Sequence, residues 1–133
     1  MSEQLDLWDD DDMGMGRQGI GVDGAIRLSV SLRTDGSLLR LRIDDNRIGP
    51  VGVSAISSVL CTNHTLKELI LSDNPVGDDG AEDLAGMLRI NRTLTSIVLM
   101  NTGIRERGSA ALASALADNP TLLRLEMGFN NVG

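Results

Sequence analysis

The chain has 133 residues, one cysteine, one histidine and a formal net charge of −7. A single cysteine excludes an internal disulfide framework, and with the absence of an apolar leader it indicates a reducing, cytoplasmic setting. The sequence has no apolar run long enough to cross a membrane, and its acidic balance argues against a nucleic-acid partner. A basic protein partner is compatible with this charge.

The acidic charge is concentrated near the N-terminal end. Residues 1–24 contain seven acidic residues and one arginine, a formal charge of −6, whereas the rest of the chain is nearly neutral at −1. We expect residues 1–12 to form an acidic N-terminal segment, either disordered or folded over the first coil as a cap through Trp8 and its leucine neighbours. The four aspartates at positions 9–12 lack the alternating spacing and the glycine of a calcium loop, so we interpret them as a solvated tail.

Residues 14–19 spell GMGRQG, which matches the GxGxxG fingerprint of dinucleotide-binding folds. A dinucleotide site also needs a buried apolar strand before the glycines, whereas here the four aspartates precede them and would repel a pyrophosphate. We therefore interpret these glycines as a loop of the repeat described next, and we expect no cofactor.

Leucines spaced 28 residues apart begin four copies of one pattern. Within a copy, apolar residues at offsets 0, 3 and 5 predict a short strand with one buried face. An asparagine or a threonine follows, then two glycines, and then a predicted helix whose apolar residues at i and i+4 face the strand. The leucines are Leu38, Leu66, Leu94 and Leu122, the polar residues are Asn46, Asn74, Thr102 and Asn130, and the helix pairs are Ile56/Leu60, Leu84/Leu88 and Leu112/Leu116.

The same register, extended backwards by one period, identifies a weaker first copy. Leu28 and Leu32 take its helix positions, and Met13 and Met15 take its strand positions. We therefore expect residues 13–133 to form one repeat domain with one degenerate coil, three full coils and one partial C-terminal coil. Thr102 lacks the amide of the asparagines, so its coil should be held less firmly.

In the order of their residues as well as in composition, the copies resemble leucine-rich repeats of the ribonuclease-inhibitor type, over about residues 10–133. The resemblance implies an α/β solenoid that curves as a horseshoe, with short parallel strands on the concave face and α-helices on the convex face. Proteins with such repeats mostly bind other proteins, so it also implies a non-catalytic interaction module.

Two short motifs suggest chemistry that the repeat explains better. Residues 63–65 and 91–93 match the acceptor pattern for N-glycosylation, but both lie at the predicted turn from a helix to the next strand, and no secretory signal accompanies them. A nucleophilic pair of Cys61 and His64 has no orienting third group, and one cysteine with one histidine falls short of the four ligands typical of a structural zinc site. We expect no catalytic residue and no metal.

Side chains between the core leucines should face the concave surface, because strand side chains alternate, and equivalent residues should stack coil by coil. Apolar residues at such positions, with charged neighbours, are typical of a recognition surface. The alternative is that β-propensity alone favours isoleucine and valine on an exposed strand. The residues that we expect to bind a protein partner on the concave face are Arg40, Arg42, Ile70, Val98, Met100 and Phe129.

The last copy stops midway through a repeat, at residues 130–133. The outer side of Leu122, Leu125 and Met127 should therefore be uncovered, whereas solenoids normally need polar caps. We expect docking or oligomerisation through this coil, in a fragment or a subunit of a larger assembly.

The resemblance also leaves two alternative functions open. Ran GTPase-activating proteins look similar in their repeats, and that activity would need a rim residue such as Arg17 or Arg47, in the loops after the strands, to complete the active site of a GTPase. The other alternative is the sensor region of a NOD-like receptor, or a ciliary or cytoskeletal scaffold such as those of the dynein regulatory complex or tropomodulin. Either of these would require a longer parent chain.

Overall fold

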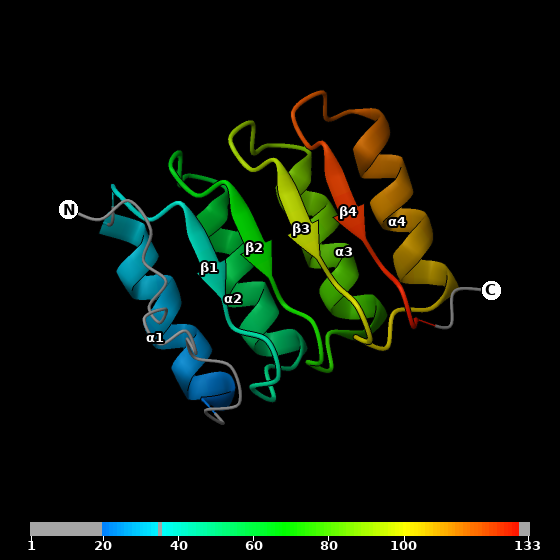
Figure 1. The fold of residues 1–133 in the computed structure, drawn as a ribbon, viewed down its shortest axis with the longest axis horizontal. Coiled ribbons are helices and arrows are strands. Elements are labelled where there is room, and N and C mark those ends of the chain that lie inside the picture. Colours follow the sequence, from blue (N-terminus) through cyan, green and yellow to red (C-terminus); the bar gives the residue numbers. More distant parts are fainter. Residues whose placement is uncertain (1–19, 35, 131–133) are drawn as a thin grey trace.

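The computed structural model describes residues 20–34 and 36–130 as a two-layer arc in which helices and strands alternate along the chain. The strands lie side by side in one layer and the helices cover one face of that layer (Figure 1). In chain order the elements are α1 (Gly21–Thr34), β1 (Arg40–Arg42), α2 (Pro50–Leu60), β2 (Glu68–Ile70), α3 (Gly77–Leu88), β3 (Ser96–Val98), α4 (Glu106–Ala117) and β4 (Arg124–Glu126).

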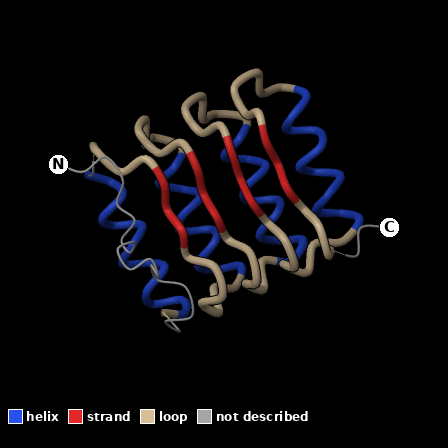
Figure 2. The backbone as a smooth tube through the Cα atoms, viewed as in Figure 1, coloured by secondary structure: helices blue, strands red, loops and turns tan. Residues whose placement is uncertain are grey.

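The sheet is parallel, with the order β1-β2-β3-β4, so each strand pairs with the strand of the next coil (Figure 2). Its register follows the sequence period, since Leu41 pairs with Leu69 and Leu69 pairs with Ile97. Backbone hydrogen bonds continue past the strand ends, as in the 2.9 Å bond from Asp45 N–H to the carbonyl of Ser72. The predicted solenoid with short parallel strands and outer helices is confirmed.

The core lies between the two layers and contains the apolar positions predicted for β1 to β3 and for the helices, except Leu116, which is only partly buried. The inward strand residues of β1, β2 and β3 and the helix pair of α3, Leu84 and Leu88, are fully buried. Each coil is too thin to bury its own apolar face, so these side chains pack between a strand, its own helix and the neighbouring coils.

The second glycine of each repeat allows neighbouring helices to approach closely. A Cβ atom on Gly52 would lie 2.8 Å from the Cβ of Ala25 in α1, and one on Gly108 would lie 2.8 Å from the Cβ of Ala81 in α3. Any larger residue would push the helices apart. The glycines near the predicted helix starts are therefore packing residues.

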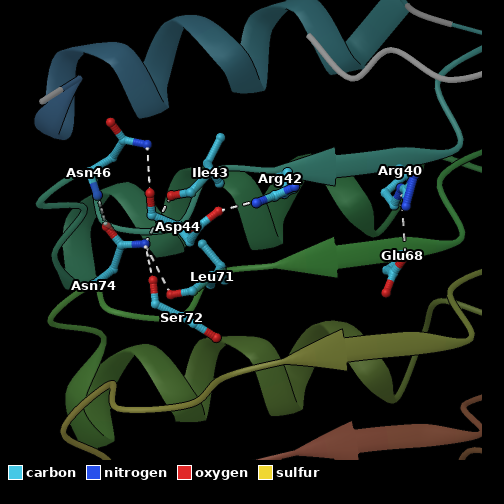
Figure 3. A network of polar contacts seen from close by, with 9 residues as sticks. All are labelled: Arg40, Arg42, Ile43, Asp44, Asn46, Glu68, Leu71, Ser72 and Asn74. Carbon is cyan, nitrogen blue, oxygen red and sulfur yellow. Dashed lines mark hydrogen bonds and ion pairs between the residues drawn. The ribbon is translucent and has the colours of Figure 1, made fainter. Parts of the chain in front are cut away.

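An asparagine after each of β1 and β2 ties its coil to the coil before it (Figure 3). Asn74 Oδ1 accepts hydrogen bonds from the N–H groups of Asn46 (2.8 Å) and Ile48 (2.9 Å). Asn74 Nδ2 donates to the carbonyls of Ile43 and Leu71, both at 3.0 Å. Asn46 Oδ1 extends this first asparagine ladder to Ile20, whose N–H lies 3.3 Å away.

Thr102 interrupts the first asparagine ladder. Its hydroxyl donates to the carbonyl of Leu99 (2.9 Å), but within the described part of the chain it accepts no bond from the backbone of the coil before it. The N–H of Val76 bonds instead to the nearby carbonyl of Asn74 (2.8 Å). Asn130 resumes the ladder, since its Oδ1 accepts from the N–H of Thr102 at 2.8 Å.

A second asparagine ladder runs along the turns from helix to strand, where the sequence predicts only a turn. Asn91 Oδ1 accepts from the N–H groups of Thr93 (2.8 Å) and Leu94 (2.7 Å), and its Nδ2 donates to the carbonyl of Leu60 (2.7 Å). Asn63 and Asn119 make the equivalent bonds one coil earlier and one coil later. The amides of Asn63 and Asn91 are buried, so a glycan on either would break a contact between coils.

The N-terminal predictions are covered only in part. The acidic segment of residues 1–12, the strand positions Met13 and Met15, and the glycines of residues 14–19 lie outside the described residues. The helix of the first coil is α1, which buries Leu28 and Leu32 as the extended register predicts.

A carboxylate of the preceding coil caps the start of α4. Asp78 Oδ1 accepts from the backbone N–H groups of Arg105 (2.7 Å) and Gly108 (2.9 Å). Arg105, the residue before the first turn of α4, provides no cap from its own side chain, and such N–H groups have no acceptor inside the helix. The hydrogen bond from Arg105 N–H is the main cause of the lowered pKa of the Asp78 carboxyl, and desolvation opposes it.

We expect Asn74→Ala to lower the free energy of unfolding by about 3 kcal/mol, because two buried N–H groups lose their acceptor. Urea denaturation measures this change. The matched control is Thr102→Ala at the equivalent ladder position, where one hydroxyl bond is lost and the cost should be about 1 kcal/mol. If the two variants lose the same free energy of unfolding, the role assigned to Asn74 is wrong.

We expect Asp78→Ala to lower the melting temperature at neutral pH, because α4 loses its cap. The pKa of Asp78 is lower in the folded chain, so its stabilising effect is present above the unfolded pKa of about 3.9 and is lost as the pH falls through the folded pKa. Thermal melts over this pH range should show that the difference in melting temperature between wild type and variant becomes smaller as the pH falls. A difference in melting temperature that stays constant down to acid pH would contradict the role of the Asp78 cap.

Candidate functional site

The concave face of the sheet carries the columns that the sequence predicts. Register places Arg40, Glu68, Ser96 and Arg124 beside one another in the first column. It places Arg42, Ile70, Val98 and Glu126 in the second column. The bond from Asp73 N–H to the carbonyl of Met100 (3.0 Å) continues the ladder past β2 and β3, so a third column holds Asp44, Ser72, Met100 and Gly128.

Ion pairs occupy the two ends of this face. At the β1 end, Arg42 Nε lies 3.4 Å from Asp44 Oδ1, and Arg40 Nε lies 3.8 Å from Glu68 Oε1 (Figure 3). At the β4 end, Arg124 Nε donates to Glu126 Oε2 at 2.8 Å. Such exposed pairs contribute about 0–1 kcal/mol each, so a partner can exchange them at little cost.

Apolar side chains occupy the middle of the face. Ile70 and Val98 are register partners on β2 and β3, and Met100 follows Val98 by two residues on the same side. All three are half-buried, which is less exposure than the sequence predicts, because neighbouring columns on the sheet cover part of each side chain. Met100 Cε lies 3.3 Å from where a Cβ of Gly128 would stand, so this glycine leaves room for the methionine.

Phe129 lies in the loop after β4, and its side chain is 83% exposed. Its backbone is left-handed, with φ of 60°, like Asp45, Asp73 and Asn101 at the equivalent positions of the other coils. Aspartate and asparagine tolerate this conformation, whereas it costs a bulky residue about 1 kcal/mol or more. A phenylalanine here combines backbone strain with an exposed ring.

Ser96 is a concave residue that the sequence does not single out. It lies between Glu68 and Arg124 in the first column, and its Oγ is buried without a hydrogen-bond partner. A hydroxyl left unpaired between two charged neighbours has an unused capacity for hydrogen bonding. The signal in the sequence is a small polar residue at a position that is charged in the other coils.

The predicted site residues fall into three places. Arg42, Ile70, Val98 and Met100 adjoin one another along the sheet. Arg40 belongs to the first column and is already paired with Glu68. Phe129 stands at the rim, in the loop next to Asn101, whose N–H bonds to the carbonyl of Gly128 (2.9 Å).

The last described coil is less covered than the others. Leu122, Leu125 and Met127 are partly buried, whereas their equivalents in the preceding coil, Leu94, Ile97 and Leu99, are fully buried. Within the described residues, nothing packs on the outer side of β4.

Groups for other chemistry are sparse in the described chain. Residues 20–34 and 36–130 bring together no cluster of three metal-ligating side chains. Every helix in that part is too short or too polar to span a bilayer. Arg47 is exposed in the loop after β1, and Arg17 lies outside the described residues.

Comparison with known proteins agrees with this geometry. The family model described as Leucine Rich repeat matches residues 37–57 and 62–85, which are two consecutive coils. No curated protein has a matching sequence.

Two solved structures share the fold. One, titled Leiomodin-1 Actin-Binding Site 2, is 24% identical with a TM-score of 0.75, over 81% of this chain and 64% of that chain. The tropomodulin C-terminal domain of Caenorhabditis elegans is 13% identical with a TM-score of 0.70, over 82% of this chain and 65% of that chain. This chain thus spans less than two thirds of either structure. The chain is thus similar to leucine-rich-repeat proteins in two matched repeats, and it shares its solenoid fold with both solved structures.

Proposed function

We propose that the chain is a non-catalytic protein-interaction module that binds a protein partner on its concave face. The observation that carries this proposal is the apolar group of Ile70, Val98 and Met100, half-exposed between two ion-paired ends of one sheet. An apolar centre with a charged rim is the usual anatomy of a protein interface. The parallel strands hold its backbone in place, so little conformational freedom of the backbone is lost on binding.

A partner that fits this face presents apolar side chains to the centre and charges of both signs to the rim. Arg42 at one end and Glu126 at the other lie in the same column as the apolar pair, so the charge changes sign along the column. The unpaired Ser96 hydroxyl adds one hydrogen-bonding group in the neighbouring column. Opposite charges at the two ends would set the direction in which the partner lies.

Actin is the first partner to test, in a cytoplasmic, cytoskeletal setting. The likeness to a structure titled as an actin-binding site of leiomodin favours this candidate over the GTPase-activating and receptor alternatives. Self-association through the uncovered side of Leu122, Leu125 and Met127 is the second contact that we propose, because those residues are less buried than their equivalents.

Replacing Ile70, Val98 and Met100 together by serine should abolish capture of the partner, because the interface loses its apolar centre. Affinity capture from native cell extract measures this, and co-sedimentation with purified actin filaments tests that candidate directly. Circular dichroism must show that the variant is folded, because the three side chains are half-buried.

The control for this test replaces exposed valines of the convex helices, Val22, Val30 and Val51, by serine, and should leave capture unchanged. Unchanged capture in the concave variant would rule out this site. Sedimentation velocity of the wild type tests self-association. A single species of monomer mass would contradict docking through the coil that contains β4.

Phe129→Asn should raise the free energy of unfolding by about 1 kcal/mol, because asparagine tolerates the left-handed backbone better than phenylalanine. The same variant should weaken partner capture, because an exposed ring is lost at the rim. Urea denaturation and capture are measured on one preparation. A variant that is less stable than wild type contradicts the strain, and unchanged capture removes Phe129 from the interface.

A further inference from the structure

A groove lies between α2 and α3, in the helical layer and away from the concave face. It has a volume of about 300 Å³. One wall comes from α2 and the other from α3, each through residues at positions i, i+3, i+4 and i+7, which share one side of a helix. The lining residues are Ser54, Ser57, Ser58 and Cys61 of α2 and its C-cap, and Asp83, Gly86, Met87 and Ile90 of α3 and the turn after it.

In this groove, small and apolar residues stand at the positions that an ion-paired group occupies one coil later. Between α3 and α4, Arg89 spans the helices and donates to Asp118 Oδ2 (2.7 Å) and Ser114 Oγ (3.0 Å). One period earlier, the residues equivalent to Arg89, Asp118 and Ser114 are Cys61, Ile90 and Gly86. A Cβ atom on Gly86 would meet nothing within 4 Å, so the space left by these changes is not refilled.

One polar group of the groove lacks a hydrogen-bond partner, and another lacks a cation. Ser57 is 4% exposed, and its Oγ makes no hydrogen bond although it lines the groove. Among residues 20–34 and 36–130, no cation pairs with Asp83, while the nearby Arg107 pairs with Asp79 (3.1 Å) and Glu82 (2.9 Å). A buried hydroxyl and a carboxylate without a cation both leave a binding capacity unused.

The electrostatics of the groove favour a positive ligand. Burial, followed by the negative charges of Asp79 and Glu82, raises the pKa of the Asp83 carboxyl, and the Ser54 hydroxyl opposes this by donating to it. A cation beside Asp83 would relieve that repulsion. The apolar surfaces of Met87 and Ile90 suit the aliphatic stem of a long basic side chain.

We propose that this convex groove binds a lysine or arginine side chain of a partner protein. The cationic head lies at Asp83 with the Ser57 hydroxyl as a further acceptor, and the stem crosses Gly86 to contact Met87 and Ile90. The site is separate from the concave face, so it gives the chain a second contact that does not depend on the first.

Cys61 provides a direct test, because it lines the groove and is the single cysteine of the chain. Its alkylation by iodoacetamide is followed while the peptide Ac-Gly-Lys-Gly-NH2 is added. At ten times its dissociation constant the peptide should slow alkylation about tenfold. The isosteric norleucine peptide should give little protection, and equal protection by both peptides would overturn the proposal.

Two substitutions separate binding from folding. Asp83→Asn should raise the peptide concentration needed for protection about tenfold, because a charged acceptor is lost. Glu106→Gln on α4 should have no effect on protection. Ser57→Ala should also weaken protection but leave the melting temperature unchanged or higher, because the hydroxyl has no partner to lose. Full protection in Asp83→Asn would contradict the proposal.

A third substitution fills the groove from within. Cys61→Arg restores the residue type found at the equivalent position of the next coil, so its guanidinium should occupy the groove and exclude the peptide. Since this variant has no thiol, the readout is the amide NMR shift of Gly86 during titration with the lysine peptide. A shift in wild type that is absent from the variant supports the site, and a shift of equal size in both contradicts it.

Discussion

Hydrogen bonding from an asparagine amide to the backbone of the preceding coil is the contact on which the rest of this structure depends. Asn74 supplies two acceptor bonds and two donor bonds in the interior, and at the opposite ends of the strands Asn63, Asn91 and Asn119 each donate to a carbonyl of the preceding coil. A coil of about 28 residues cannot pair all the buried N–H and C=O groups of its own turns. These groups therefore form hydrogen bonds with asparagine side chains of the neighbouring coil. The two ladders fix the spacing of the coils at both ends of each strand.

The regular spacing is what makes the concave face a surface. Because each coil is held in register with the next, equivalent side chains form straight columns, and a change of one residue alters one site in a column. Apolar residues on β2 and β3 adjoin in this way, while the charges on β1 and β4 remain at the ends. Where the ladder weakens, at Thr102, the backbone of the coil before it turns to a local bond instead.

In the helical layer, the contacts between neighbouring coils change along the length of the helices. Neighbouring helices meet closely at the glycines near their starts, and towards their ends the contact depends on longer side chains, such as Arg89 with Asp118. The α2–α3 pair lacks the arginine, and a groove lies between its two helices. A solenoid can therefore carry different contacts on its two faces, since the strands and the helices vary independently along the repeat.

The period of 28 residues determined the architecture, because apolar residues that recur at fixed offsets leave one way to bury them all. The parallel sheet, the core leucines and the concave columns followed from that pattern, including the proximity of Ile70, Val98 and Met100. Tertiary structure decided how far each side chain is exposed, because exposure depends on neighbouring columns that lie a whole period away. Three further features became visible only in the tertiary structure: the second asparagine ladder, the left-handed backbone at Phe129 and the groove beside Cys61. Each depends on how neighbouring coils are arranged in space, which the order of residues within one coil does not specify.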